Sequence, residues 1–162
     1  MRYEVVMRQT GTRLAKLEDI PLLALFEREL ARIAFPEDPI DDLEYHANRL
    51  RKSMRKEPDG MVVLVDSESG EVLAWMWAVT KTTLATAETY GVLRSIYVRP
   101  AARGANIGAM LAQYALRYFE GLGITRVVTK LHHTNLVGIR TVEKAGFEGM
   151  HLTLQWRAET ED

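Results

Sequence analysis

The chain has 162 residues, 47% of them hydrophobic, and carries a formal net charge of −1. This length suits one domain, over residues 1–162, with a substantial core. The small charge excludes the overall positive field that attracts nucleic acid or anionic membranes. The absence of cysteine excludes disulfides, thiolate-bound zinc and a covalent cysteine intermediate, and no apolar run approaches the ~20 residues of a membrane span. We therefore expect a cytoplasmic domain with no nucleic-acid or membrane partner.

The first half of the chain opens with a short predicted strand, "YEVVM", at residues 3–7. A helix is predicted over 17–33, where apolar side chains recur on one face and Asp19 is placed to cap the N-terminus. A second helix is predicted over 40–57, because acidic residues stand at its start and basic residues at its end. The helix dipole favours that order of charges.

Residues 61–80 have the pattern of a β-hairpin. Two apolar runs, "MVVLV" and "VLAWMWAVT", are joined by the turn-rich segment "DSESGE". Trp75 and Trp77 are two residues apart in the second strand and therefore share one face. We expect both rings in the hydrophobic core rather than on the floor of a substrate site.

The second half alternates strands and helices. Strands are predicted at 92–98, 124–131 and 150–156, and helices from about Asn106 and over 135–146. Because strand, helix and strand follow one another after the hairpin, the pattern predicts a mixed α/β domain with at least one parallel strand pair.

The junction "RGANIG", residues 103–108, places two glycines between a strand and a helix. It lacks the lysine and hydroxyl of a Walker loop and the glycine spacing of a dinucleotide fingerprint. It matches a third anion-binding pattern, R/Q-x-x-G-x-G/A, except at Asn106. Backbone N–H groups at a helix N-terminus suit a diphosphate, and glycines let its oxygens approach. Asparagine tolerates left-handed backbone better than most residues with side chains.

Two motifs together, "IYVRPAARGANIGAML" and "NLVGIRTVEKAGF", resemble the GNAT superfamily of acyl-CoA-dependent N-acyltransferases. The resemblance is strongest over residues 92–147. It implies a single α/β domain with a mixed central sheet, flanked by helices and splayed open between the strands at 92–98 and 124–131. It also implies acetyl-CoA as the co-substrate, with its pantetheine arm in the split.

The resemblance further implies which residues hold the cofactor. Backbone groups of Ile96, Tyr97 and Val98 would pair with the pantetheine arm, and Asn135 would stand beside it or only cap its own helix. The pyrophosphate would lie on Arg103, Gly104, Ala105, Asn106, Ile107, Gly108 and Ala109. No metal is expected, because the adjacent His132 and His133 would point to opposite faces and lack partners at metal spacing.

The chemistry implied is direct attack of an amine on the thioester, without an enzyme nucleophile. A backbone N–H of Tyr97 or Val98 is the expected donor to the tetrahedral oxyanion. The general base is left open between Glu88, His132 and His133, with Glu88 preferred because partial burial raises the pKa of a carboxyl. The hydroxyl of Tyr97 or Thr141 could return a proton late in the reaction.

Besides Asn106, which replaces a glycine, two features depart from the family's pattern. Val142 stands seven residues after Asn135, where the family usually has a tyrosine that protonates the thiolate. Only one strand, at 150–156, is predicted after "EKAGF". A non-catalytic acyl-CoA-binding or sensor domain of the same fold therefore stays as an alternative to the enzyme, and a plain nucleotide-binding module is a third.

The acceptor is expected to be a small-molecule or peptide amine. A cationic amine is favoured if the acidic segment 37–44 borders the cleft. Alternation in the last strand would turn Met150, Leu152, Leu154 and Trp156 inward and leave the strand's far edge free. An uncovered edge associates with another chain, so a homodimer is expected.

Overall fold

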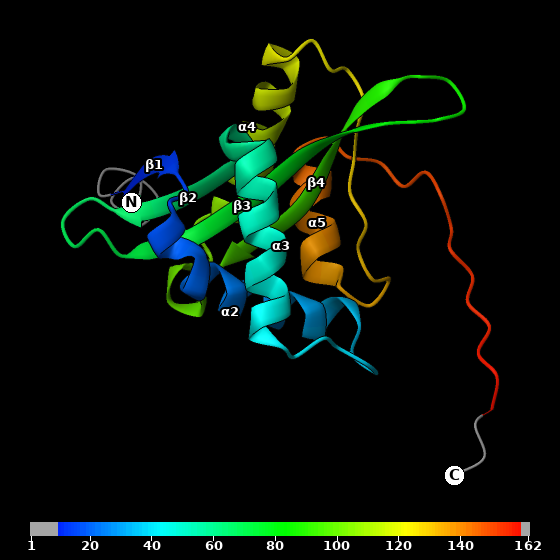
Figure 1. Ribbon diagram of the computed structural model, residues 1–162, viewed down its shortest axis with the longest axis horizontal. Helices are drawn as coiled ribbons and strands as arrows, with labels where there is room; N and C mark the ends of the chain where they lie inside the picture. Colours follow the sequence, from blue (N-terminus) through cyan, green and yellow to red (C-terminus); the bar gives the residue numbers. More distant parts are fainter. Residues whose placement is uncertain (1–9, 160–162) are drawn as a thin grey trace.

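A mixed β-sheet forms the middle layer of the computed structural model, which describes residues 10–159 (Figure 1). Within that range the sheet has five strands in chain order: β1 (Thr10–Leu14), β2 (Met61–Asp66), β3 (Val72–Thr82), β4 (Thr89–Val98) and β5 (Val127–Val128). The first four strands pair antiparallel, and β5 pairs parallel with β4. The predicted fold class and the parallel pair are confirmed. The strand predicted at 3–7 lies outside the described residues.

Helices cover both faces of this sheet (Figure 1). The α-helices of the described range are α2 (Ile20–Ala34), α3 (Leu43–Lys56), α4 (Ile107–Gly121) and α5 (Leu136–Lys144). Three short 3-10 helices are η1 (Leu17–Asp19), η2 (Pro58–Gly60) and η3 (Pro100–Ala102). The first two α-helices pack on one face and α4 packs on the other, with α5 beside α4. All four predicted helices are present. No helix within residues 10–159 is both long and apolar enough to cross a bilayer.

Trp75 and Trp77 lie in the layer between the sheet and α2 and α3. Their side chains are almost fully buried, which confirms their place in the core. The cap predicted at Asp19 is wrong, and the acidic start of α3 supplies a cap that was not predicted. Asp42 accepts hydrogen bonds from the first backbone N–H groups of α3. Asp19 stands before α2 but makes no cap bond, because its carboxylate is taken by Arg13 at 2.7 Å and by the backbone of η1.

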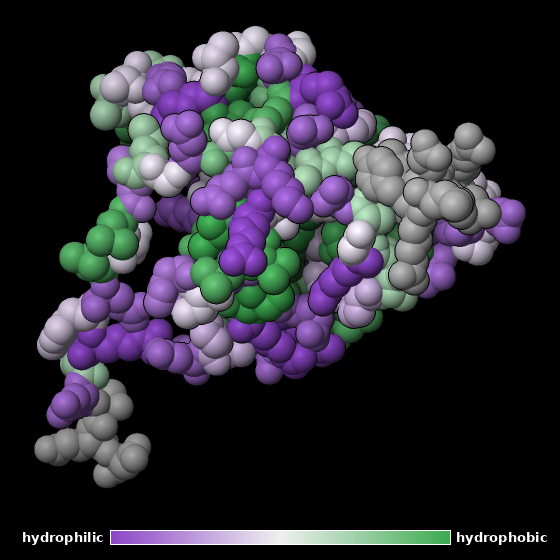
Figure 2. All heavy atoms as spheres, turned by 180° about the vertical axis from the view of Figure 1, so that it is seen from behind, coloured by the Kyte–Doolittle hydropathy of each residue, from purple (hydrophilic) through white to green (hydrophobic). Residues whose placement is uncertain are grey.

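The C-terminal segment corrects two predictions. Residues 150–156 form no strand, and the segment runs away from the sheet (Figures 1 and 2). The side chains expected to point inward are all exposed, including Leu154 and Trp156 at 85% each. The strand predicted over 124–131 shortens to the two residues of β5. A strand of two residues offers few backbone groups for a further strand to bond. Within residues 10–159 no strand pairs with the side of β5 that faces away from β4.

Candidate active site

The sheet opens between β4 and β5. The two strands pair only at Gly91↔Val127 and Val92↔Val128, and the hydroxyl of Thr129 then donates to the carbonyl of Leu93 at 2.9 Å. On the other side of β4, the register with β3 shifts at this same point, so that Arg94 becomes a bulge residue. From Arg94 to Val98, β4 has no β5 partner in the described chain, as the expected splay requires.

Backbone alternation decides which groups of β4 face the split. The N–H of Arg99 donates to the carbonyl of Leu73 at 2.9 Å, on the β3 side. In an antiparallel ladder every second residue bonds the same neighbour, so Tyr97 also faces β3. Ile96 and Val98 face the split instead, and Arg103 Nε donates to the Val98 carbonyl at 2.9 Å. The expectation that the Tyr97 backbone faces the split is corrected on this ground.

The loop after β4 ends at the N-terminus of α4. Gly104 has φ +91° and Asn106 has φ 55°, so the left-handed backbone expected at Asn106 is present. The first intrahelical bond joins Met110 N–H to the Asn106 carbonyl at 3.0 Å, which leaves the N–H groups of residues 107–109 without helical acceptors. The Asn106 side chain does not cap them, because it accepts from Lys144 Nζ at 3.1 Å. These free donors fit a phosphate.

The reason expected for Gly108 differs from what the structure shows. A Cβ at Gly108 would lie 2.8 Å from Cγ2 of Thr141 on α5. The glycine therefore lets α4 and α5 approach each other. A Cβ at Gly104 would meet no atom within 4 Å, which leaves the backbone on that side open to a ligand.

The start of α5 confirms the capping role of Asn135. Its Oδ1 accepts from the backbone N–H of Gly138 at 2.9 Å. Further along the helix Val142 is buried at 8% exposure and offers no hydroxyl. The Thr141 hydroxyl donates to the carbonyl of Val137 at 2.8 Å and is thus already engaged.

Glu88 does not have the environment expected of a general base. Its carboxylate is half exposed and pairs with Arg126 through two hydrogen bonds of 2.9 and 3.1 Å. This pairing holds the pKa of Glu88 below its ordinary value, the reverse of the expected shift. Glu88 also precedes Thr89 at the far end of β4, six residues before the bulge residue Arg94, about 20 Å away at the rise of an extended strand.

His132 and His133 follow β5, at the end of the strand where the sheet opens. Their rings lie 4.7 Å apart at 32°, so they stand together rather than on opposite faces, because the chain is not a strand here. His132 Nδ1 lies 2.6 Å from the hydroxyl of Thr134. Tyr97 stacks its ring on Phe26 of α2, with centroids 4.4 Å apart. The catalytic roles of His132 and Tyr97 stay predictions.

The buried carboxylate of Glu27 is the site residue that sequence reasoning missed. It is 6% exposed and accepts from Trp75 Nε1 at 2.9 Å and from Ser95 Oγ at 3.0 Å. Burial raises the pKa of Glu27, against the opposing influence of its two hydrogen bonds and of the nearby Arg49 and His46. The signal was present, because Glu27 follows Leu23 by four residues on the apolar stripe of α2.

Ser95 ties this carboxylate to β4 close to where the sheet splits. It is the residue after the bulge at Arg94, and its hydroxyl points to α2 on the opposite face of the sheet from α4. Glu27 therefore lies behind the strand at the position where β4 loses its parallel partner. The arrangement joins a proton-accepting group to an open strand edge and a helix N-terminus.

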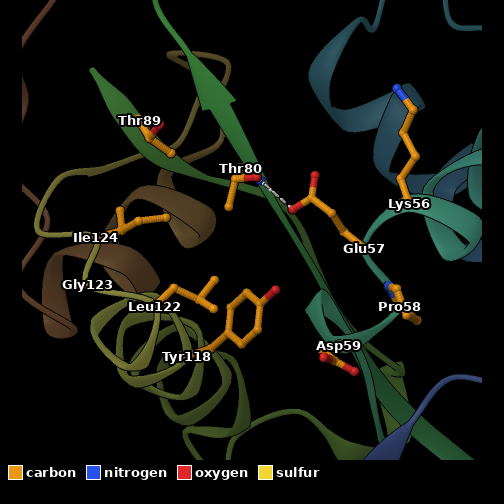
Figure 3. A pocket seen from close by; sticks show the side chains of 10 residues that line it. All are labelled: Lys56, Glu57, Pro58, Asp59, Thr80, Thr89, Tyr118, Leu122, Gly123 and Ile124. Atoms are coloured by element: carbon orange, nitrogen blue, oxygen red, sulfur yellow. Dashed lines mark hydrogen bonds between the residues drawn. The ribbon is translucent and has the colours of Figure 1, made fainter. Parts of the chain in front are cut away.

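Two cavities lie near β4. One of about 480 Å³ borders Tyr97, Arg99 and η3, at the same end as the split. The other, of about 580 Å³, lies between η2 and the end of α4 (Figure 3). There Glu57 bonds the backbone and hydroxyl of Thr80. Because this second cavity reaches β4 only at Thr89, it is distant from the donors of α4.

A sheet that splits beside a helix N-terminus defines a class of α/β protein able to hold an extended ligand with a phosphate at one end. The particular family follows from sequence. The chain belongs to the acetyltransferase (GNAT) family, whose sequence model matches residues 24–147. This family uses acetyl-CoA. The free edge of β4, the open Gly104 and the unbonded donors at 107–109 fit such a group.

Curated relatives match part of the chain, and solved structures share its fold. Mycothiol acetyltransferases of Stackebrandtia nassauensis and Mycobacteroides abscessus are each 30% identical over 91 residues, 56% of this chain. The match spans only 29% and 30% of those proteins. A predicted acetyltransferase of Clostridium acetobutylicum, solved with acetyl-CoA, superposes with TM-score 0.69 at 18% identity, covering 91% of this chain and 96% of that one. An aminoglycoside 6'-N-acetyltransferase of Acinetobacter haemolyticus gives 0.67 at 15%, covering 93% and 99%.

Proposed function

We propose that the protein transfers the acetyl group of acetyl-CoA to a primary amine within a ternary complex. The observation that carries the proposal is the position of Glu27 and Ser95 at the bulge where β4 becomes free. A carboxylate buried at that point suits proton removal from an amine, which a purely binding protein does not need.

The pyrophosphate is expected on the free N–H groups of residues 107–109 and beside Gly104, and the pantetheine arm along the open edge of β4. From Val98 back to Arg94 the strand covers about 13 Å at its usual rise. An extended pantetheine arm has a comparable length, so its thioester would lie near the bulge. The free backbone groups of Ile96 would then be its neighbours.

In the reaction, the amine nitrogen attacks the thioester carbon and forms the new C–N bond. The carbonyl oxygen gains the negative charge, and the N–H of Ile96, the open-edge donor nearest the bulge, is placed to stabilise it. When the tetrahedral intermediate collapses, the C–S bond breaks and coenzyme A leaves as a thiolate.

The amine must lose a proton as it attacks. We assign that proton to the Ser95–Glu27 pair: the nitrogen gives a proton to Ser95 Oγ, whose own hydrogen passes to Glu27 Oε2 along the 3.0 Å bond. The raised pKa of Glu27 suits this role, because a general base works best when its pKa approaches the working pH. The departing thiolate needs no acid at Val142, because a thiol with a pKa of about 8.5 is a good leaving group near neutrality.

The test is a thiol-release assay with acetyl-CoA and a panel of amines of every charge class, run beside acetyl-CoA binding by calorimetry. We expect thiol release that requires an amine and yields the N-acetylated product. If acetyl-CoA binds but no amine supports release above the hydrolysis rate, the enzyme proposal fails. The sensor alternative, which the missing hydroxyl at Val142 favours, would then stand.

A further inference from the structure

Two arginines lie against the ring of Trp77. The guanidinium of Arg49, from α3, lies 5.3 Å from the ring centroid, and that of Arg94, from the β4 bulge, lies 5.2 Å from it. Arg49 is half-buried and Arg94 is exposed. Both guanidinium groups thus contact the same indole, and each is close enough to act on the charge of the other.

Neither arginine has an ion-pair partner within residues 10–159. The ion pairs of that range, up to 4.0 Å, involve other arginines. The carboxylates whose charge acts on Arg94 are those of Glu27 and Glu57. Each is already engaged, Glu27 with Trp75 and Ser95 and Glu57 with Thr80.

The proximity of Arg49 and Arg94 is electrostatically unfavourable. Partial desolvation lowers the pKa of Arg94, and the charge of Arg49 lowers it further, while Glu27 and Glu57 oppose the shift. Two like charges brought together without a counter-ion are relieved by an anion between them.

The arginines stand at the proposed reaction centre. Trp77 is the register partner of Ser95, the residue that bonds Glu27. Arg94 immediately precedes Ser95 in the bulge. An anion bound between Arg49 and Arg94 would therefore lie beside the expected position of the acceptor amine.

We propose that Arg49 and Arg94 bind an anionic group, a carboxylate or a phosphate, carried by the acceptor amine. The inference rests on the proposed acetyl transfer and names its substrate class. It predicts an acceptor that carries an anionic group, in place of the cationic acceptor expected from the acidic segment 37–44. In the structure Asp41 pairs with Arg32, Glu37 with Arg157 and Glu44 with Arg51, and Asp42 caps α3, so among the described residues of this segment only the Asp38 carboxylate has no partner.

The first arm of the test measures binding without catalysis. Because Trp77 lies against both arginines, its fluorescence should report an anion. The wild-type protein, in the presence of coenzyme A, is titrated with N-acetylglycine and with its neutral twin, N-acetylglycinamide. O-phospho-N-acetylethanolamine and N-acetylethanolamine form the second pair and distinguish a phosphate from a carboxylate. We expect saturable binding of one anion, at least tenfold tighter than its neutral twin, weakened at least tenfold by Arg49→Gln and by Arg94→Gln.

The matched control is Arg55→Gln, which removes the same charge from an exposed position of α3. It should leave anion binding unchanged. Equal binding of the anionic and neutral twins, or an equal loss in the Arg55 variant, would overturn the proposal. Circular dichroism and acetyl-CoA affinity show that each variant is folded.

The second arm compares kcat/KM for amines with and without an anion, namely amino acids against their C-terminal amides and O-phosphoethanolamine against ethanolamine. We expect the anionic member of one pair to be preferred at least tenfold, with Arg94→Gln abolishing the preference mainly through KM. A preference for the neutral members contradicts the inference. Selective anion binding without acetylation of any amine would instead refute acetyl transfer and leave the arginine site standing.

Discussion

Ser95 Oγ donates a hydrogen bond to Oε2 of Glu27 at 3.0 Å, joining residues 68 positions apart in the chain. The bond ties α2 to β4 at the residue after the bulge, where the sheet opens. It connects a carboxylate that is almost fully buried to the part of β4 that has no β5 partner. The account of this protein as an acetyltransferase depends on that connection.

Burial of Glu27 makes folding stability depend on pH. Because its folded pKa is raised above the ordinary value of 4.5, the folded state binds more protons, and stability falls as pH rises through the raised pKa. Glutamine carries no charge: its oxygen can accept from Trp75 Nε1, and its NH2 can donate to Ser95 Oγ once the Ser95 hydroxyl turns from donor to acceptor. We expect Glu27→Gln to match or fall below wild type near pH 4 and to exceed it near pH 8, by up to about 1.4 kcal/mol for each tenfold increase in proton affinity on folding. Urea denaturation across this range measures the difference, and a constant difference would contradict it.

A substitution at Gly104 tests the proposed pyrophosphate site. Alanine at φ +91° is strained by about 1–2 kcal/mol, and its methyl group would stand where the phosphate is expected. We expect Gly104→Ala to weaken acetyl-CoA binding at least tenfold by calorimetry. Gly70→Ala is the matched control, since φ there is +75° and a Cβ would likewise meet no atom. It should lose similar stability but bind acetyl-CoA normally, and equal binding by both variants would remove Gly104 from the site.

Gly108 tests helix packing. An added Cβ would lie 2.8 Å from Thr141 Cγ2, so we expect Gly108→Ala to destabilise the fold by about 1–3 kcal/mol, as overpacking does. Thr141→Ser removes Cγ2 and retains the hydroxyl. The double variant should therefore recover most of the loss, which denaturation of all four proteins measures as a coupling energy. Strictly additive losses would show that the two residues do not oppose each other.

The exposed side chains of the C-terminal segment bear on assembly. Met150, Leu152, Leu154 and Trp156 are 71–85% exposed, and Figure 2 shows the segment standing apart from the body of the molecule. We propose that these side chains bury one another between two copies of the chain. Sedimentation velocity at tens of micromolar should give a dimer for the wild type and a monomer for a Leu152→Ser/Leu154→Ser variant. A monomeric wild type would end this proposal.

Local patterns predicted much of this molecule. The apolar stripe of α2, the charge order of α3, the hairpin around Trp75 and the junction at Gly104 each depend on neighbours in sequence, so local patterns placed their elements correctly. The Arg126 partner that lowers the pKa of Glu88 is 38 residues away, and only the fold brings the two together.

Local sequence patterns could not predict the proposed reaction centre either, because only the fold brings its residues together. Trp75 and Ser95 are 48 and 68 residues from Glu27, so no local pattern relates the three. The strand predicted at 150–156 is wrong for a different reason. Strict alternation predicts which side chains share a face, but a strand also needs a partner edge, and β5 has only two residues.

The pH dependence of kcat/KM for Glu27→Gln, with one good amine, tests the central claim most directly. Glu88→Gln serves as the control, because Glu88 is a surface partner of Arg126. We predict that Glu27→Gln lowers kcat by 10²–10⁴-fold and removes the acidic limb of the profile, while its affinity for acetyl-CoA stays that of the wild type. The Glu88→Gln variant should keep the wild-type kcat and pH profile. A Glu27→Gln enzyme with the wild-type rate and the wild-type acidic limb would contradict the account.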